Sequence, residues 1–444
     1  MSLAPSIELP ADRTRRVLRK VYTRFLLLLI VAYFFSQLER TNLGLAASTF
    51  NVDIGISVAA YGLGAGLFFL TYAALEIPSN LLLRRFGARV WIVRIMVTWG
   101  ILAIAMAFVW NEPSFYVVRL LFGAAEAGFY PGVHYLITRW FPQAERPKAI
   151  GILLFGGLFS ATLGSPLGGL LLQLDGVGGF QGWQWLFVLE GIPALIIAVL
   201  IWRFLADSPS TARWLSKDDG EWLERTIEAE NTTSAHSVGL RSFVDVLKDI
   251  PILLVTFVYF TVSLITYALT YFLPGIIGTM GTFTPFEIGL INAVPWVFTM
   301  IGVFVVPRLA ARTHSFLAWL IVSLSGSIAG FAIVLLADGW FAFLGFCLIG
   351  LFLLTPSTIL FSYAGYRMDG SNLAAGLALV SSIGITGGFV GPYLLGGIQQ
   401  ATGSVDLGLV FVAGFAGLAL LASVALFVMN RLRPLPSAAT DTAP

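Results

Sequence analysis

The sequence predicts an all-α polytopic membrane protein, with twelve transmembrane helices arranged as two pseudo-symmetric halves of six. Composition is the first reason, because 57% of the 444 residues are hydrophobic and only 11% are charged, against about 25% charged residues in an average soluble domain. The second is a series of long apolar stretches, and the third is the confinement of lysine and arginine to alternate loops. Together these features exclude a soluble globular protein, a disordered chain and a nucleic-acid-binding protein.

Twelve stretches are long and apolar enough to be spans, since one bilayer crossing needs about 20 apolar residues. In the first half they cover 25–48, 59–82, 90–110, 114–137, 148–173 and 185–205. In the second half they cover 251–279, 286–306, 315–336, 340–363, 373–398 and 405–430. The expected domains are therefore a basic tail (1–24), an N-terminal bundle (25–206), a central loop (207–250), a C-terminal bundle (251–430) and a second tail (431–444).

The positions of the basic residues predict the orientation of the chain. Of the 26 lysines and arginines, 23 lie in the two tails and in alternate loops, including the central loop, whereas the remaining loops contain none. Cytoplasmic loops carry the excess of lysine and arginine. We therefore expect a multi-pass protein of the cell (plasma or inner) membrane, with both termini and the central loop in the cytoplasm.

The two halves of the sequence show weak similarity to each other. The basic loop from Arg85 to Arg89 after the second span corresponds to the loop from Arg308 to Arg312 after the eighth. Gly/Pro-rich segments occur in spans 5 and 11, at 164–169 and 391–397. Such segments in corresponding spans indicate bending or close packing where two repeats move against each other.

Charged residues inside the spans are the candidate functional residues. All of them lie in the N-terminal half: Arg40, Arg94, Arg119, Glu39, Glu76, Glu126 and Glu190. A charge at the bilayer centre costs at least about 2.5–3.5 kcal/mol, so each of these groups should line water or have a partner.

Arg40 and Arg119 are predicted to bind an anion, because the planar guanidinium matches a carboxylate. Glu39 or Glu126 would carry a proton, since burial favours the neutral carboxylic acid until an arginine stabilises its charge. Arg119 and Glu126 are seven residues apart and should share one helix face, roughly 10.5 Å apart along the axis. The alternative interpretation is a set of static ion pairs that hold the helices together.

Other polar residues in the spans have less specific roles. Glu76 and Arg94 lie towards the predicted cytoplasmic ends of spans 2 and 3, which favours a structural pair or a gate latch. Glu190 is expected to be structural. The C-terminal half offers uncharged groups that could contact a substrate, on spans 7, 8 and 11 respectively: Tyr267, Asn292 and Ser381.

Several segments resemble the anion:cation symporter family of the major facilitator superfamily. Span 1 contains ERTNLGLA at 39–46, which is similar to that family's Asp-Arg-x-Asn-x-Gly-x-Ala. Span 4 contains RLLFGAAEAGFYPG at 119–132, the most specific of the matching segments. Segments at 76–83 and 182–187 also match, and the resemblance extends over about 25–430.

The resemblance implies alternating-access uptake of organic anions, usually driven by protons in bacteria. Carried over by position, Arg40 and Arg119 would touch the substrate carboxylate. Glu39 and Glu126 would be protonation sites, and Tyr72 falls where the family has a cavity tyrosine. Structural or gating roles are assigned to Glu76, Arg94, Arg85 and Arg89.

Three positions depart from the family pattern. Glu39 replaces the usual Asp, which keeps the charge on a longer arm. Arg84 stands where the loop motif of the superfamily usually has an acid. Span 11 has SSIGI at 381–385 where the family often has Asn-Ser-Ile-Gly-Asn. The loss of two amides points to a substrate with fewer hydroxyl groups.

These observations predict a secondary transporter that imports an organic anion, such as a sugar acid, a dicarboxylate or an aromatic acid, together with protons. It is expected to use the proton gradient without a cofactor or metal, to act as a monomer among membrane lipids, and to bind no nucleic acid. The alternatives are an exporter or uncoupled facilitator of the same fold, a membrane enzyme or a sensor. The sequence shows no nucleophile–base or metal constellation that would support an enzyme.

Overall fold

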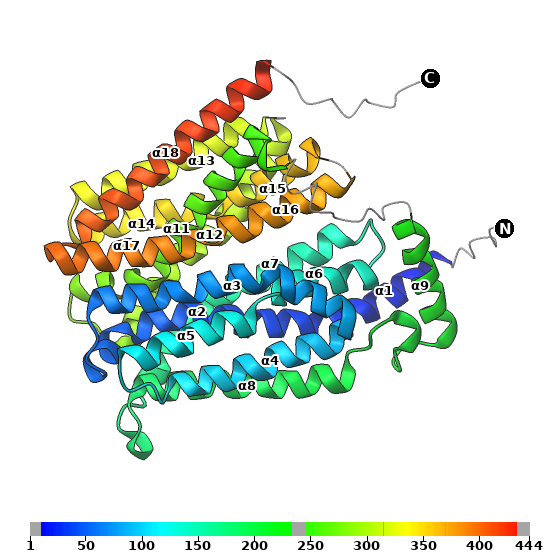
Figure 1. The fold of residues 1–444 in the computed structure, drawn as a ribbon, viewed down its shortest axis with the longest axis horizontal. Coiled ribbons are helices and arrows are strands. Elements are labelled where there is room, and N and C mark those ends of the chain that lie inside the picture. Colours follow the sequence, from blue (N-terminus) through cyan, green and yellow to red (C-terminus); the bar gives the residue numbers. More distant parts are fainter. Residues whose placement is uncertain (1–9, 233–245, 314, 369, 433–444) are drawn as a thin grey trace.

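The computed structural model describes residues 10–232, 246–313, 315–368 and 370–432. This part of the chain is helical and contains no strand. Figure 1 shows two helical bundles side by side, with both chain ends at the same side of the molecule. We call this the terminal side, and the other end of the bundles the opposite side.

The N-terminal bundle begins with a continuous helix made of α1 (Ala11–Lys20), the π-helical η1 (Val21–Leu26) and α2 (Leu27–Asp53). It continues with α3 (Val58–Phe86), α4 (Ala88–Met106), α5 (Glu112–Glu126), α6 (Phe129–Trp140), α7 (Arg146–Leu172), η2 (Val177–Gly179) and α8 (Gly182–Phe204). The central segment adds η3 (Pro209–Thr211) and α9 (Lys217–Thr232).

The C-terminal bundle contains α11 (Ile250–Thr279), α12 (Pro285–Arg312), α13 (Phe316–Leu336), α14 (Gly339–Leu353), α15 (Thr355–Arg367), α16 (Gly370–Gly384), α17 (Gly387–Thr402) and α18 (Val405–Leu432). In the described part of the chain, 11 helical segments are long and apolar enough to cross a membrane. The remaining predicted span, 114–137, is formed by α5 and α6, which are each too short to count alone.

The break between α5 and α6 gives the fourth span its shape. Ala127 leaves the helical region and Gly128 follows with a positive φ of 85°, which a side chain would disfavour. The Ser79 hydroxyl of α3 donates to the freed carbonyl of Ala127 (2.6 Å). Arg94 of α4 donates weakly to the Ala125 carbonyl (3.4 Å), where a cation complements the negative end of the helix. These two contacts stabilise the end of α5, and Glu126 is the last residue of this helix.

The Gly/Pro-rich segments of spans 5 and 11 serve close packing. Pro166 and Pro392 lie inside the continuous helices α7 and α17. The interruption in span 11 falls earlier, at Ile385 and Thr386 between α16 and α17. The prediction of bending at these prolines is therefore not matched by a helix break, whereas close packing is observed.

The two bundles meet through α3 against α17, α7 against α12, and α2 against α11. Glycines bring these backbones together towards the opposite side. A Cβ added to Gly62 would collide with the Pro392 carbonyl, and one on Gly289 would collide with the Ser165 carbonyl. Small residues allow this close approach in membrane bundles.

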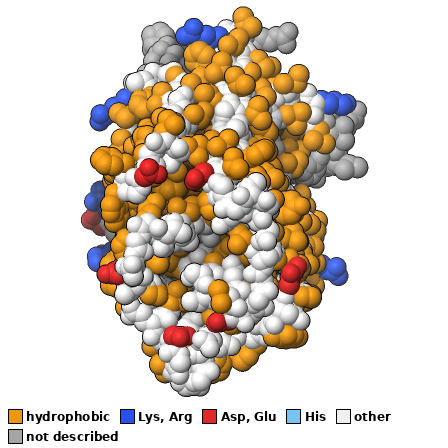
Figure 2. All heavy atoms as spheres, turned by 90° about the vertical axis from the view of Figure 1, so that its left-hand side faces the viewer, with side chains coloured by type: hydrophobic (Ala, Val, Ile, Leu, Met, Phe, Trp, Pro, Cys, Tyr) orange, Lys and Arg blue, Asp and Glu red, His pale blue; other side chains and the backbone are white. Residues whose placement is uncertain are grey.

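Acidic residues occupy the opposite side. The face in Figure 2 shows several separate carboxylates among apolar and uncharged groups. The helix ends and loops on this side carry exposed acids: Asp53, Glu112, Asp175, Glu287, Asp338 and Asp406. Lysine and arginine are absent from the same loops.

Side-chain contacts attach the central segment to the N-terminal bundle. Arg13 of α1 forms an ion pair with Asp219 of α9 (2.7 Å). Partial burial raises the pKa of Asp219, but hydrogen bonds with Ser216 and Arg13 outweigh this effect and hold the pKa below its ordinary value. Glu230 accepts from the backbone amide of Gln143 (2.7 Å). The start of the central segment is therefore a docked element of the N-terminal half.

Replacing Gly62 with valine should disrupt the close contact on the opposite side, because the new side chain has no room beside Pro392. We expect Gly62→Val to separate the bundles and thereby expose Thr270, which is 6% exposed and lies beside Gly44 where α2 meets α11. The measurement is labelling of Thr270→Cys by a membrane-impermeant maleimide, in a Cys347→Ser background. Gly397→Val is the matched control, since nothing lies within 4 Å of a Cβ there. Equal labelling of both variants would contradict the role of Gly62.

Candidate substrate site

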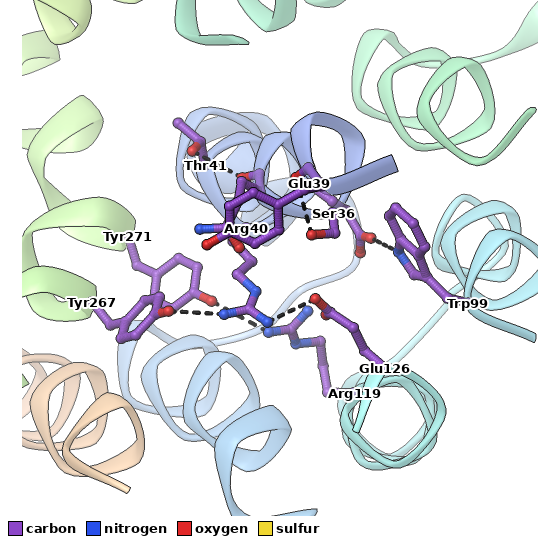
Figure 3. A network of polar contacts seen from close by, with 11 residues as sticks. Ser36, Glu39, Arg40, Thr41, Trp99, Arg119, Glu126, Tyr267 and Tyr271 are labelled. Carbon is purple, nitrogen blue, oxygen red and sulfur yellow. Dashed lines mark hydrogen bonds and ion pairs between the residues drawn. The ribbon is translucent and has the colours of Figure 1, made fainter. Parts of the chain in front are cut away.

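The site is built around Arg40, in the middle of the first span. Its guanidinium donates to Glu126 Oε1 (2.7 Å) and to the Tyr267 hydroxyl of α11 (2.9 Å). One side chain therefore connects α2, α5 and α11, as Figure 3 shows. The Arg40 side chain keeps 12% exposure, against 2% for Glu126. Arg40 is thus the more accessible member of the ion pair.

Arg119 approaches the same place from α5 (Figure 3). It is 2% exposed and donates to the Ala65 carbonyl of α3 (3.2 Å) and the Tyr271 hydroxyl (3.5 Å). It also donates to the Gly64 carbonyl (3.4 Å). Among the described residues, no acidic side chain forms an ion pair with Arg119, so its hydrogen bonds go to neutral acceptors, while Glu39 and Glu126 act on its charge only from a longer distance.

Aromatic rings surround both guanidinium groups. The Phe68 ring centroid lies 4.9 Å from Arg40 Cζ and 5.0 Å from Arg119 Cζ. The Tyr72 ring lies 5.4 Å from Arg40 Cζ. A cation over an aromatic face is stabilised by the ring quadrupole. These rings therefore help to keep two like charges close together in an apolar interior.

The predicted site residues fall into two groups. Arg40, Arg119, Tyr72, Tyr267 and Glu126 come together in one cluster, which we call the arginine cluster. Asn292 and Ser381 lie elsewhere along the interface between the bundles. Asn292 donates to the Ser165 hydroxyl of α7 (2.9 Å), and Ser381 donates to Glu76 (3.2 Å).

Glu39 points away from its neighbour Arg40, because adjacent helical residues face about 100° apart. It is 3% exposed and accepts a hydrogen bond from Trp99 of α4. Glu190 lies on α8, which also packs against α2. Neither of its carboxyl oxygens has a hydrogen-bond partner among the described residues. The N-terminal bundle thus contains two further buried carboxyl groups outside the arginine cluster.

Glu76 and Arg94 do not form the expected pair within the described structure. Glu76 instead accepts from Ser381 and Ser382 (2.8 Å) of α16, and so connects the two bundles. Arg94 lies over the Trp91 ring (4.1 Å) and reaches the end of α5. Arg94 contacts the end of α5 and not Glu76 because the α5–α6 break exposes carbonyl groups that attract the Arg94 guanidinium.

Arg85 and Arg89 lie at the terminal side of the N-terminal bundle. Arg85 lies over the ring of its neighbour Phe86 (5.7 Å). Arg89 donates to the Trp202 carbonyl of α8, and its backbone amide donates to Asp207 (3.2 Å). Their gating role stays a prediction. The described residues contain no group of three or more His, Cys, Asp or Glu side chains that could hold a metal ion.

Sequence reasoning missed two members of the site. Trp99 and Phe68 lie among apolar neighbours on α4 and α3, where nothing in the periodicity distinguishes an aromatic residue of the site from one that only packs. A buried tryptophan N–H usually requires an acceptor, which was the available signal for Trp99. Phe68 could have been found only from the spatial proximity of Arg40 and Arg119.

Comparisons with known proteins show the family of the chain. The family model described as Major Facilitator Superfamily matches residues 29–392. A protein named "Putative tartrate transporter" from Agrobacterium vitis is 38% identical, over 95% of this chain and 93% of its own length. A "Quinolone resistance transporter" from Acinetobacter baumannii is 37% identical, over 90% of this chain and 93% of its own length.

Solved structures agree on the fold. A bacterial homologue of the human lysosomal transporter Spinster superposes with a TM-score of 0.75 at 17% identity, covering 92% of this chain and 97% of that one. The predicted all-α fold and the family resemblance are confirmed, and the protein is a multi-pass membrane transporter and not an enzyme. The chain belongs to the Major Facilitator Superfamily.

Proposed function

We propose that the protein is a proton-coupled symporter that takes up a small organic anion bearing a carboxylate. The observation that carries this proposal is the buried guanidinium of Arg119, which has no carboxylate partner among the described residues. A lone cation is costly inside a membrane. An incoming carboxylate would supply the missing counter-charge and could accept two parallel hydrogen bonds from a guanidinium.

The Arg40–Glu126 pair provides a means of coupling. A substrate carboxylate that engages Arg40 competes with Glu126 for the same N–H groups. Glu126 then loses its counter-charge in a buried site, where an ionised carboxylate is costly, and takes up a proton. Anion and proton would therefore bind together. The hydrogen bond from Arg40 to Tyr267 would change at the same time, and this would couple binding to the position of the C-terminal bundle.

The substrate class follows from the same charges. Arg40 and Arg119 together carry two positive charges against one for Glu126, which suits a carboxylate and disfavours a cation. The relative named "Putative tartrate transporter" supports a small dicarboxylate as the first compound to test. Sugar acids and aromatic acids remain in the proposed class.

Orientation is part of the proposal. The lysines and arginines on the terminal side, and their absence from the loops of the opposite side, support cytoplasmic termini under the positive-inside rule. In this orientation the glycine contacts at Gly62 and Gly289 lie on the outer side of the cell membrane. Uptake would begin when these contacts open.

Export or uncoupled diffusion is the second candidate function, because a relative of similar identity is named "Quinolone resistance transporter". The two candidates differ in the direction of net flux and in the charge of the compound. Anion uptake needs the free guanidinium of Arg119, whereas expulsion of an uncharged or cationic compound does not.

Proteoliposomes containing the purified protein should accumulate radiolabelled tartrate when the outside is acidic, because the proton gradient drives the anion inwards. Accumulation should disappear when a protonophore collapses the gradient. A sugar acid and an aromatic acid extend the panel if tartrate is not recognised. If the uptake of every tested anion is the same with and without the pH gradient, the proposal of proton symport is contradicted.

The Glu126→Gln variant should lose gradient-driven accumulation but keep counterflow exchange of the same anion, because glutamine imitates the protonated acid. Asp406→Asn serves as the matched control, since Asp406 is an exposed acid on the opposite side. Both assays use the same vesicles with and without a pH gradient. Gradient-driven accumulation in Glu126→Gln at the wild-type level would show that Glu126 is not the coupling group.

A further inference from the structure

A groove of about 960 Å³ lies on the terminal side of the N-terminal bundle, outside the arginine cluster. Its walls come from η1, the start of α2 and the end of α8. Arg89 near the start of α4 and the segment around η3 complete them. These elements meet at the terminal ends of the first and sixth spans, in the region where α8 runs towards α9 in Figure 1. A groove at this position faces the boundary between the lipid tails and the aqueous phase.

The polar wall of the groove is cationic. Arg24, Arg89, Arg203 and Arg213 line it, and none of the lining residues is acidic. Arg24, Arg203 and Arg213 are exposed and form no ion pair with any described residue. The nearest acid along the lining segments, Asp207, accepts a hydrogen bond from the Arg89 backbone amide (3.2 Å). The Arg89 guanidinium donates to the Trp202 carbonyl, whereas the guanidinium groups of Arg24, Arg203 and Arg213 are free to bind an anion.

The other wall of the groove is apolar. Leu27, Val31 and Leu200 line it below the arginines, along the membrane-facing parts of α2 and α8. Trp202 and Trp214 stand near the arginines, as tryptophan does at membrane interfaces. The groove is therefore amphiphilic, with cations towards the aqueous phase and aliphatic side chains towards the hydrocarbon.

Several contacts keep this shape in place. The Trp214 ring stacks on Trp140 (5.4 Å), and Trp140 stacks on Phe25 (4.4 Å). Arg89 lies over the Trp202 ring (4.8 Å), while its Nε has no hydrogen-bond partner among the described residues. The walls are consequently fixed by packing within the bundle.

We propose that this groove binds one anionic phospholipid, such as phosphatidylglycerol. The phosphate would lie among Arg24, Arg203 and Arg213, and an acyl chain would lie along Leu27, Val31 and Leu200. Clusters of basic residues beside membrane helices recognise anionic headgroups in this way. The lipid would connect the first span, the sixth span and the central segment, and this proposal does not depend on the transported substrate.

The test is native mass spectrometry of the full-length protein, released from nanodiscs with equal amounts of phosphatidylglycerol and phosphatidylcholine. Wild-type protein should retain phosphatidylglycerol preferentially. The triple variant Arg24→Gln, Arg203→Gln, Arg213→Gln should lose this preference by on the order of a hundredfold, about fivefold per arginine. No preference in the wild-type protein would overturn the proposal.

The matched control is Arg308→Gln, Arg312→Gln, Arg431→Gln, which removes three terminal-side charges from the C-terminal bundle. It should keep the wild-type lipid ratio. An equal loss in both triple variants would show general surface attraction and overturn the assignment to the groove. If the first triple variant does not fold, Arg213→Gln alone should weaken retention about fivefold, and unchanged retention would contradict the proposal.

A headgroup without tails separates a lipid site from a phosphate site. Glycerophosphoglycerol should not displace phosphatidylglycerol at concentrations where a short-chain phosphatidylglycerol does, because it cannot contact Leu27, Val31 and Leu200. Displacement by both compounds at the same concentration would show that the groove recognises a free phosphate, and would contradict the lipid proposal.

Discussion

The constraint on which the rest of the structure depends is that a charge in the hydrocarbon region must find a partner. Glu126 satisfies it with Arg40, and Glu76 with two serine hydroxyls of the other bundle. Arg94 satisfies it with a carbonyl freed by the break in the fourth span. Arg119 donates hydrogen bonds only to neutral acceptors, lies beside aromatic rings, and has Glu126 near it without a direct ion pair. Among the three arginines of the spans, the distribution of partners thus distinguishes Arg40, which is paired with a carboxylate, and Arg94, which is bound at a helix end, from Arg119, which has no carboxylate in direct contact.

The arrangement of the bundles places the charge of Arg119 where both halves can respond to it. Arg40 and Arg119 come from the N-terminal bundle, whereas Tyr267 and Tyr271 come from α11 of the C-terminal bundle. Glycine contacts between α3 and α17, and between α7 and α12, bring the halves together on the opposite side. A ligand that changes the hydrogen bonds of Arg40 therefore acts on the interface that must rearrange during transport.

Much of the fold could be predicted from the sequence, because spans and basic loops follow directly from solvation in a bilayer. Arg40, Arg119 and Glu126 could be named as candidates from the sequence, since they are rare charges in apolar segments, and their roles in binding and coupling stay predictions. Of the structural pair or gate latch expected for Glu76 and Arg94, the direct pair is not formed, because their partners depend on the α5–α6 break and on the approach of α16, and the latch role stays a prediction. Trp99 was missed because its acceptor, Glu39, lies on another span. Contacts between spans have no signature in a uniformly apolar sequence.

The central claim is that the free charge of Arg119 recruits the carboxylate of the substrate. The most direct measurement is the affinity of purified protein for its transported anion, by calorimetry, in the wild type and in Arg119→Gln, with Arg312→Gln as an exposed control. A hydrogen bond to a charged group contributes about 1.5–3 kcal/mol, so Arg119→Gln should weaken binding at least about tenfold while the control binds normally. Wild-type affinity in Arg119→Gln would contradict the account.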